Sequence, residues 1–318
     1  MNDYFDWYDE QRKNLNEENW QSHRYLIMQC LTTDAHCGGT SDRLKPFPLM
    51  MLFAFRSKRL FMIRWTRPCA LEHFLVPNGY NWTVPEWLVP HTTKARSKHC
   101  TNNECFQKVM HTNTTFLLGK LQTFDGGSVY FNEQFNDTSY EMVYHDLFRL
   151  FFTPSPGVAK IIQEEMTTVG LIAGEYATAH YRAFYGTRMP NETMIVSTAI
   201  NAVECASELR PGGPIYFASD STFALQTIQT YAKQYSRPVV VIQNKEPLHL
   251  DKANSTNPED YYSVFVDLYL LGMGRCGSVG MGGFGRFGLL LSYNSSCWNR
   301  HSYNRQRLDC SWKDAPIQ

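Results

Sequence analysis

The sequence has no excess of charge of either sign and no long apolar run. Its 318 residues contain 30 Lys and Arg residues and 30 Asp and Glu residues, so the formal net charge is zero. A general nucleic-acid binder needs a basic face, so this balance argues against nucleic acid as a partner. No stretch reaches about eighteen consecutive apolar residues, and basic residues interrupt the most apolar region, 49–63. We therefore expect contact with a membrane only through an anchor outside this sequence.

The sequence also lacks the apolar core of a signal peptide in its first thirty residues. Nine cysteines and six Asn-x-Ser/Thr sequons nevertheless favour a secretory compartment. Two alternatives remain: an anchor precedes this sequence and the protein lies in the ER or Golgi lumen, or the protein is not secreted. We expect the first. The sequons begin at Asn81, Asn113, Asn136, Asn191, Asn254 and Asn294.

The odd number of cysteines leaves at least one thiol outside a disulfide. Cys100 and Cys105 are close enough in sequence to bridge. With His99 they could also suggest a metal site, but no second ligand pair follows at the spacing of a zinc finger. We therefore expect no bound metal.

Composition predicts a globular protein of two domains. The sequence is 43% hydrophobic and 14% aromatic, which is typical of a folded chain, and its length exceeds that of most single domains. The segment Thr153-Pro-Ser-Pro-Gly157 is a turn in which Ser155 can cap a helix and Pro156 can take its first position. We place the boundary there, between an N-terminal domain, 1–156, and a C-terminal domain, 157–318.

Alternating strands and helices after this turn predict a doubly wound α/β domain. The first domain begins with a stem or a loose helix, and the region 91–136 is expected to form loops with short elements. In the second domain the segment Val239–Ile242 is typical of a strand inside a parallel sheet. The expected segments are the strands Leu26–Leu31, Leu60–Trp65, Tyr176–Tyr181, Ile215–Ala218 and Val239–Ile242, the helices Tyr140–Phe152 and Thr222–Tyr235, and the stem or helix Asn2–Trp20.

A Gly-Gly loop, Cys37–Lys45, follows the first expected strand. Gly38 and Gly39 can adopt backbone angles closed to other residues, so their amides can converge on an anion. Asp42 and Arg43 place a carboxylate and a guanidinium at the start of the helix. The structural alternative is a turn with a surface ion pair.

Two Gly-rich segments match the dinucleotide fingerprint literally. Gly272-x-Gly274-x-x-Gly277 follows an expected helix rather than a strand, and only 33 residues follow Gly280-x-Gly282-x-x-Gly285. These are too few for the strands that complete a dinucleotide-binding domain. The pattern therefore does not predict an oxidoreductase.

The order of motifs resembles the fucosyltransferase superfamily that includes the nodulation, core α1,6 and protein-O-fucosyl enzymes. In the first half, Cys37–Lys45 is followed by the strand-like segment Arg59–Arg67, then Pro68, Leu71, Pro77-Asn78 and Trp82. The resemblance implies a GT-B-like α/β fold with two Rossmann-like domains facing a cleft. It also implies GDP-fucose as the donor, no metal, and a hydroxyl of a glycan or glycoprotein as the acceptor.

The second half continues the resemblance in three segments: His180-Tyr-Arg182, Ala218-Ser-Asp220, and Val266-Asp-Leu268 followed by the turn at Gly282-Gly283. By this resemblance Asp267 would contact guanine, and Arg182 and the turn would hold the diphosphate. The structural alternatives are an ion pair for Arg182, a helix cap for Asp220 and a helix-connecting loop at Gly282. The resemblance assigns catalysis to Asp42, Arg43 and Arg182, and donor binding to Gly38, Gly39, His180, Arg182, Asp220, Asp267, Gly282 and Gly283.

The chain also departs from the family pattern. A second basic residue and an acidic residue usually follow His-x-Arg, but this chain has Ala183-Phe184-Tyr185-Gly186. Gly283 stands where the phosphate turn usually has Ser, and Ser41 where the first loop usually has Gly. The general base therefore cannot be carried over. Two alternatives follow: an inactive member that binds a nucleotide sugar or glycan, and a non-enzymatic lumenal interaction protein on the same scaffold.

Overall fold

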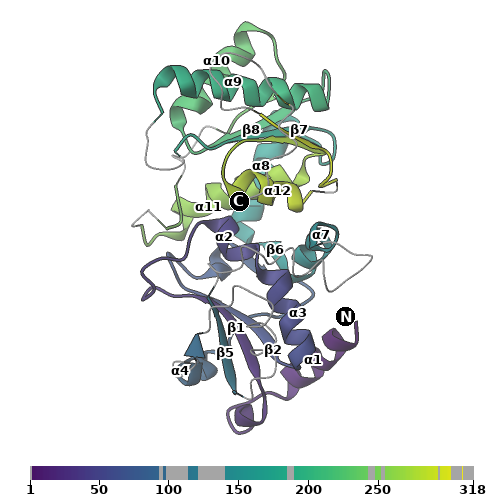
Figure 1. The fold of residues 1–318 in the computed structure, drawn as a ribbon, viewed down its shortest axis with the longest axis vertical. Helices are drawn as coiled ribbons and strands as arrows, with labels where there is room; N and C mark the ends of the chain where they lie inside the picture. The colour runs from purple at the N-terminus through teal and green to yellow at the C-terminus, as the bar shows by residue number, and fades with distance from the viewer. Residues whose placement is uncertain are drawn as a thin grey trace. The chain divides into compact units, whose positions relative to one another are not determined.

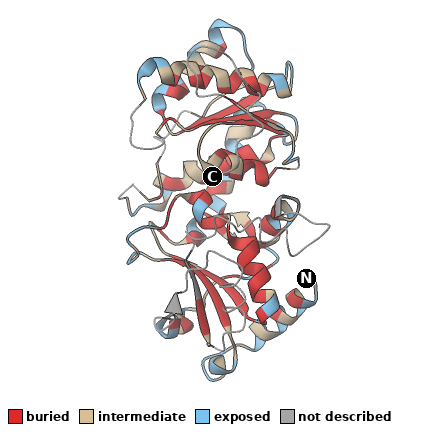
Figure 2. Cartoon of the chain, viewed as in Figure 1, coloured by how far each residue is buried: buried red, intermediate tan, exposed pale blue. Residues whose placement is uncertain are grey.

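The computed structural model describes residues 2–92, 96–97, 114–120, 140–184, 190–242, 248–251, 255–292, 294–301 and 310. The chain divides into two compact units, 1–153 and 154–318. Each unit is built around a parallel sheet whose strands are largely buried (Figures 1 and 2). Cys100 and Cys105, which could form a disulfide or a metal site, lie outside the described residues. Three sequons also lie outside them, at Asn113, Asn136 and Asn254.

The first unit contains a four-stranded parallel sheet in the order β2-β1-β5-β4. Its two predicted strands are confirmed as β1 and β2, which pair with Tyr25 opposite Leu60 and Cys30 opposite Trp65. Strand β5 falls in the region 91–136, which was expected to be mostly loops. The strands are β1 (Tyr25–Cys30), β2 (Leu60–Trp65), β4 (Arg96–Ser97) and β5 (Phe116–Lys120), and a separate pair is formed by β3 (Leu75–Pro77) and β6 (Phe152–Pro154).

Of the two alternatives expected for residues 2–20, a stem or a loose helix, the helix is observed, but it is part of the core and not loose. Tyr4 and Tyr8 of α1 are buried, and the Tyr8 ring stacks on Tyr80 with centroids 4.1 Å apart. Such aromatic contacts hold a polar helix whose sequence alone shows little apolar periodicity. The helices are α1 (Asn2–Asn14), α2 (Thr40–Leu44), α3 (Phe47–Ser57), α4 (Val89–Thr92) and α7 (Tyr140–Phe151), with short 3₁₀ turns at Trp20–Ser22, Leu71–His73 and Glu86–Leu88.

The second unit contains a five-stranded parallel sheet in the order β11-β10-β7-β8-β9. Two predicted strands are confirmed as β7 and β8. The third was placed wrongly in the sheet interior: β9 covers only Val239–Val240, is half-buried and lies at an edge. An apolar run cannot by itself distinguish an inner strand from an edge strand. The strands are β7 (Ala177–Tyr181), β8 (Ile215–Ser219), β9 (Val239–Val240), β10 (Cys276–Val279) and β11 (Trp298–Arg300).

Helices cover both faces of this sheet (Figure 1). Ala179 and Phe217 point toward α9 and α10, while Thr178 and Tyr216 point toward the face covered by α11. As predicted, Ser155 caps α8 by accepting from the Val158 amide, and Pro156 opens the helix. The helices are α8 (Pro156–Val169), α9 (Glu192–Leu209), α10 (Thr222–Gln234), α11 (Tyr262–Met273) and α12 (Gly283–Leu290), with a 3₁₀ turn at Pro258–Tyr261.

Three disulfides fasten the described part of the chain. Cys30–Cys37 lies in the first unit, and Cys205–Cys310 and Cys276–Cys297 lie in the second. Cys69 is buried. None of the helices in the described ranges has the length and apolar character needed to cross a bilayer.

Candidate functional site

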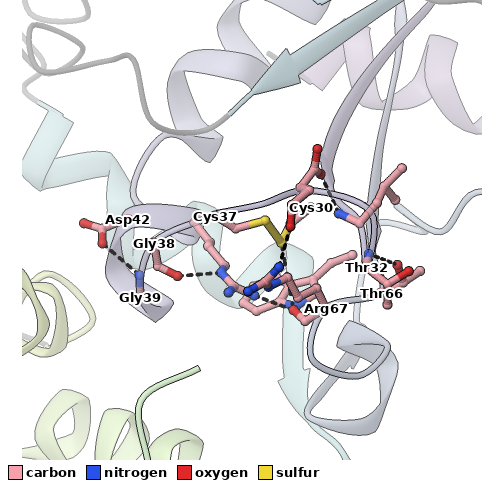
Figure 3. The surroundings of a disulfide bond; sticks show 12 residues. Cys30, Thr32, Cys37, Gly38, Gly39, Asp42, Thr66 and Arg67 are labelled. Carbon is pink, nitrogen blue, oxygen red and sulfur yellow. Dashed lines mark hydrogen bonds between the residues drawn. A yellow bond between two sulfur atoms is a disulfide. The ribbon is translucent and has the colours of Figure 1, made fainter. Parts of the chain in front are cut away.

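The Gly-Gly loop leaves the end of β1 and is held there by the Cys30–Cys37 disulfide (Figure 3). Gly38 has φ +77°, and a Cβ at this position would lie 2.7 Å from the Asp42 Cβ, so the turn requires glycine. The Gly39 amide, expected to help bind an anion, donates instead to Asp42 Oδ2 at 2.9 Å. Asp42 therefore closes the N-terminus of α2.

Arg43 is fully buried, so its expected alternative as half of a surface ion pair is wrong. Its Nε donates to the Gly38 carbonyl at 2.8 Å, and its Nη1 donates to the Arg67 carbonyl. Its guanidinium carbon also lies 4.5 Å from the centre of the Trp65 ring, in cation–π geometry. These contacts fix the Gly-Gly loop against the end of β2. Direct roles for Asp42 and Arg43 in catalysis stay predictions.

Four of the sequence-predicted residues of the second unit follow neighbouring strands at one edge of its sheet, whereas His180 lies within β7 and Asp267 lies on α11. Strands β10, β7 and β8 are neighbours and parallel, so their carboxyl ends meet there. Gly282 and Gly283 follow β10, Arg182 follows β7, and Asp220 follows β8. This is the edge at which open α/β sheets bind ligands.

Asp220 organises the end of β7 and does not cap the following helix. Its Oδ1 accepts from the Ala183 amide at 2.6 Å, its Oδ2 accepts from the Phe184 amide at 3.3 Å, and Oδ2 lies 3.9 Å from Arg182 Nε. Burial raises the pKa of the Asp220 carboxyl, and the Ala183 amide and Arg182 oppose this shift. The cap of α10 is Ser221, which accepts from the Ala224 amide. Asp220 thus holds the segment that carries Arg182.

His180 lies beneath the Gly-rich turn as a neutral packing residue. It is buried, and its ring centroid is 5.3 Å from that of Phe284 in α12. Burial, and then the charge of Arg182, lowers the pKa of His180 to about 3. The imidazole is therefore uncharged at neutral pH, and its effect on a ligand would pass through α12.

We expect Gly285→Ala to move this helix. The added Cβ would lie 2.7 Å from His180 Nδ1 and 2.8 Å from its Cβ, so a side-chain rotation cannot relieve the contact. Overpacking of this kind costs about 1–3 kcal/mol, against a gain of about 1 kcal/mol in helix propensity. Urea unfolding should show a net loss of stability, and an unchanged midpoint would contradict this packing.

The Gly282-Gly283 turn connects β10 to α12. Gly282 has φ +89°, which favours glycine, and as the N-cap residue it makes no side-chain hydrogen bond to the first turn of α12. The segment Gly280–Gly285 therefore follows a strand and opens a helix, unlike Gly272–Gly277, which spans the end of α11 and the start of β10. Helix N-termini of this kind attract anions.

A cavity of about 240 Å³ lies beside β8, between that strand, α8 and α11. Asp267 lines it, and the Tyr216 hydroxyl donates to Asp267 Oδ1 at 2.5 Å. Burial raises the pKa of Asp267 to about 7, and the hydrogen bond from Tyr216 opposes the shift. The lining is apolar apart from three carboxyl groups, a tyrosine and two serines: Ile161, Glu164, Glu165, Tyr216, Phe217, Ala218, Ser219, Leu225, Ile242, Ser263, Val266 and Asp267.

Sequence reasoning missed Tyr216, Glu164 and Glu165. Side chains alternate between the two faces of a strand, so the expected strand Ile215–Ala218 places Tyr216 and Phe217 on opposite faces. The sequence does not show which helix covers the face that carries Tyr216. The segment Tyr185–Met189, which includes two departures from the family pattern, lies outside the described residues. Groups of three or more metal-ligand side chains are absent from the described ranges.

No protein-family model matches the sequence, and no curated protein matches it. Among solved structures, a point mutant of Arabidopsis thaliana FUT1 in complex with GDP matches with a TM-score of 0.58 at 12% identity, over 92% of this chain and 73% of that chain. POFUT1 in complex with GDP matches more loosely, with a TM-score of 0.45 at 12% identity, over 85% of this chain and 94% of that chain. The predicted GT-B-like α/β fold and the resemblance to fucosyltransferases at the level of fold are confirmed.

Proposed function

We propose that this chain is a metal-independent fucosyltransferase that takes GDP-fucose as donor and a hydroxyl of a glycan or glycoprotein as acceptor. The observation that carries the proposal is a cavity with a carboxylate on its wall, beside a sheet edge that carries an arginine and a helix N-terminus with glycine as its N-cap residue. A purine base with N–H donors suits the cavity, and a diphosphate suits the arginine and the helix N-terminus. The fold shared with a GDP-bound fucosyltransferase supports the same assignment.

The charges of the side chains indicate which part of the donor each part of the site would bind. The cavity carries Asp267, Glu164 and Glu165 and would repel phosphate, so it would take the base. Arg182 has a partly exposed side chain and would bind the diphosphate, together with the amides at Gly282 and Gly283. Neutralising the leaving diphosphate lowers the barrier to glycosyl transfer. The Gly38–Arg43 loop of the first unit is proposed to serve the acceptor or the leaving group.

A second candidate is a binder without transferase activity. This candidate is favoured because acidic residues at the proposed site are already engaged in hydrogen bonds. Asp220 is engaged by two amides and Arg182, and Asp42 by the Gly39 amide, so neither is poised as a general base. A transfer and hydrolysis assay with GDP-fucose, run with and without chelator, separates the two candidates and tests metal independence.

We expect GDP to stabilise the protein more than UDP or CMP does, because the cavity presents acceptors to a base with two adjacent N–H donors. At about 100 times its dissociation constant a ligand adds about 2.7 kcal/mol to the free energy of unfolding. Thermal shift across the three nucleotides measures this. Equal shifts for all three, or none, would remove the guanine assignment.

We also propose that the protein works in the ER or Golgi lumen. Three disulfides support an oxidising compartment. Three sequon asparagines in the described ranges, Asn81, Asn191 and Asn294, are exposed and so accessible to glycosylation.

A further inference from the structure

We propose that Tyr216 is a positioning residue that holds Asp267 as the acceptor for guanine and makes donor binding depend on the protonation of that carboxyl. The inference rests on the proposed function and adds a pH response to it. It comes from the hydrogen-bonded pair that the buried Tyr216 and the partly buried Asp267 form on the wall of the cavity.

The hydrogen bond from Tyr216 fixes the carboxyl group in place. Its hydroxyl donates to Oδ1 at 2.5 Å, and Tyr216 itself is only 1% exposed. Asp267 Oδ2 has no hydrogen-bond partner among the described residues. One oxygen of Asp267 is thus anchored by the protein, and the other is left to accept from a ligand.

The cavity has the size of a base rather than of a whole nucleotide sugar. Its volume is about 240 Å³, below the roughly 300–1,000 Å³ of sites that enclose a drug-sized ligand. Phe217, Leu225 and Val266 contribute apolar surface to its lining. A carboxylate accepts hydrogen bonds and cannot donate them, so an ionised Asp267 matches the adjacent N–H and NH₂ groups of guanine. A protonated Asp267 would present an O–H donor in place of one acceptor, so half of the hydrogen-bond match to guanine would be lost.

The surroundings determine when the proton binds. Burial raises the pKa of Asp267 to about 7, and the Tyr216 hydroxyl lowers it. The same burial, and then the charge of Asp267, raises the pKa of Tyr216 well above its usual range, so Tyr216 remains a donor throughout. A ligand that needs ionised Asp267 therefore binds fully above the pKa and is lost as pH falls through it.

Other titratable groups face this pair from the elements packed on it. Glu164 and Glu165 of α8 line the same cavity, and Lys160 lies 3.8 Å from Glu164 on the exposed side of that helix. Tyr176 of the region before β7 donates to the Leu270 carbonyl of α11 at 2.6 Å. The charged residue of α12, Arg286, lies over the Trp298 ring. The two glutamates add negative charge to the wall of the cavity.

The test is the affinity for GDP-fucose over roughly three pH units centred on 7. This donor is used because its diphosphate is a diester and does not titrate in the range. Apparent affinity follows the ionised fraction of Asp267, so we expect it to fall about tenfold for each pH unit below the pKa. Asp267→Asn should bind weakly and show no such slope.

Tyr216→Phe distinguishes positioning from mere packing. Losing a hydrogen bond to the charged form raises the pKa of Asp267, so the pH of half-maximal affinity should move upward while affinity recovers at the alkaline end. Tyr176→Phe is the matched control, because it removes a buried tyrosine hydroxyl bonded to the same helix without touching Asp267. Its pH profile should match that of the wild type.

Three outcomes would overturn the inference. The first is a wild-type affinity that does not change with pH, and the second is a Tyr216→Phe affinity reduced equally at every pH. In both cases GDP-fucose still binds, so the proposed function stands. The third is no binding of GDP-fucose by the wild type at any pH, which overturns the proposed function as well.

Discussion

Arg182→Ala is expected to weaken GDP binding by about 30- to 150-fold. Arg182 follows β7 at the carboxyl edge of the second sheet, and its Nε lies 3.9 Å from Asp220 on a segment fixed by two backbone amides. A hydrogen bond to a charged group contributes about 2–3 kcal/mol, and each 1.4 kcal/mol changes affinity about tenfold. Titration calorimetry with GDP measures the loss.

Arg182→Lys should restore only part of this affinity, because Lys keeps the charge but cannot bind two phosphate oxygens at once. The matched control is Arg237→Ala. Arg237 also pairs with a carboxylate, with its Nη2 2.7 Å from Glu204 Oε2, but it precedes β9 at the opposite end of the sheet. It should leave GDP affinity unchanged. A folded Arg182→Ala protein with wild-type affinity would refute the diphosphate site.

Arg43→Ala is expected to destabilise the protein by about 3 kcal/mol or more. The substitution removes a fully buried side chain, leaves the Gly38 and Arg67 carbonyls without their donor, and opens a void beside Trp65. For a unit of this size each kcal/mol corresponds to about 2–4 °C in the unfolding temperature. Differential scanning calorimetry should therefore show a fall of about 6–12 °C.

The same variant separates two roles for the loop. GDP affinity should stay near the wild-type value, because the proposed nucleotide contacts belong to the second unit, while turnover should fall. Arg56→Ala is the control, since Arg56 is exposed on α3 and its loss should change stability by less than about 0.5 kcal/mol. An Arg43→Ala protein with unchanged unfolding and unchanged turnover would contradict both roles and favour the inactive binder.

Local patterns were enough to predict the elements that carry the site. The strands β7 and β8, the cap at Ser155 and the Gly-rich turn after β10 follow from apolar runs, capping residues and glycine spacing, which act over a few residues. The same patterns did not predict the burial of α1 or the edge position of β9, because both depend on partners of Tyr8 and Val239 that are distant in sequence.

The chemistry of the candidate site was less accessible from the sequence. A cap for α10 was the structural alternative for Asp220, but Ser221 is one residue closer to the helix and takes that role. A surface ion pair was the structural alternative for Arg43, whereas the Trp65 ring and two carbonyls hold its side chain in the interior. The Tyr216–Asp267 pair joins residues 51 positions apart. No short sequence motif predicts a contact between residues so far apart in the chain.

The Cys276–Cys297 bond has a consequence for how this protein is assayed. Cys276 begins β10, the strand that ends at the Gly-rich turn, and Cys297 directly precedes β11. Thiol reductants are routine additives in enzyme buffers, and here they would loosen the strand that positions the proposed diphosphate contacts. A preparation kept in dithiothreitol could then fail to bind nucleotide although every residue of the site is intact, so purification and assay buffers should be free of reductant.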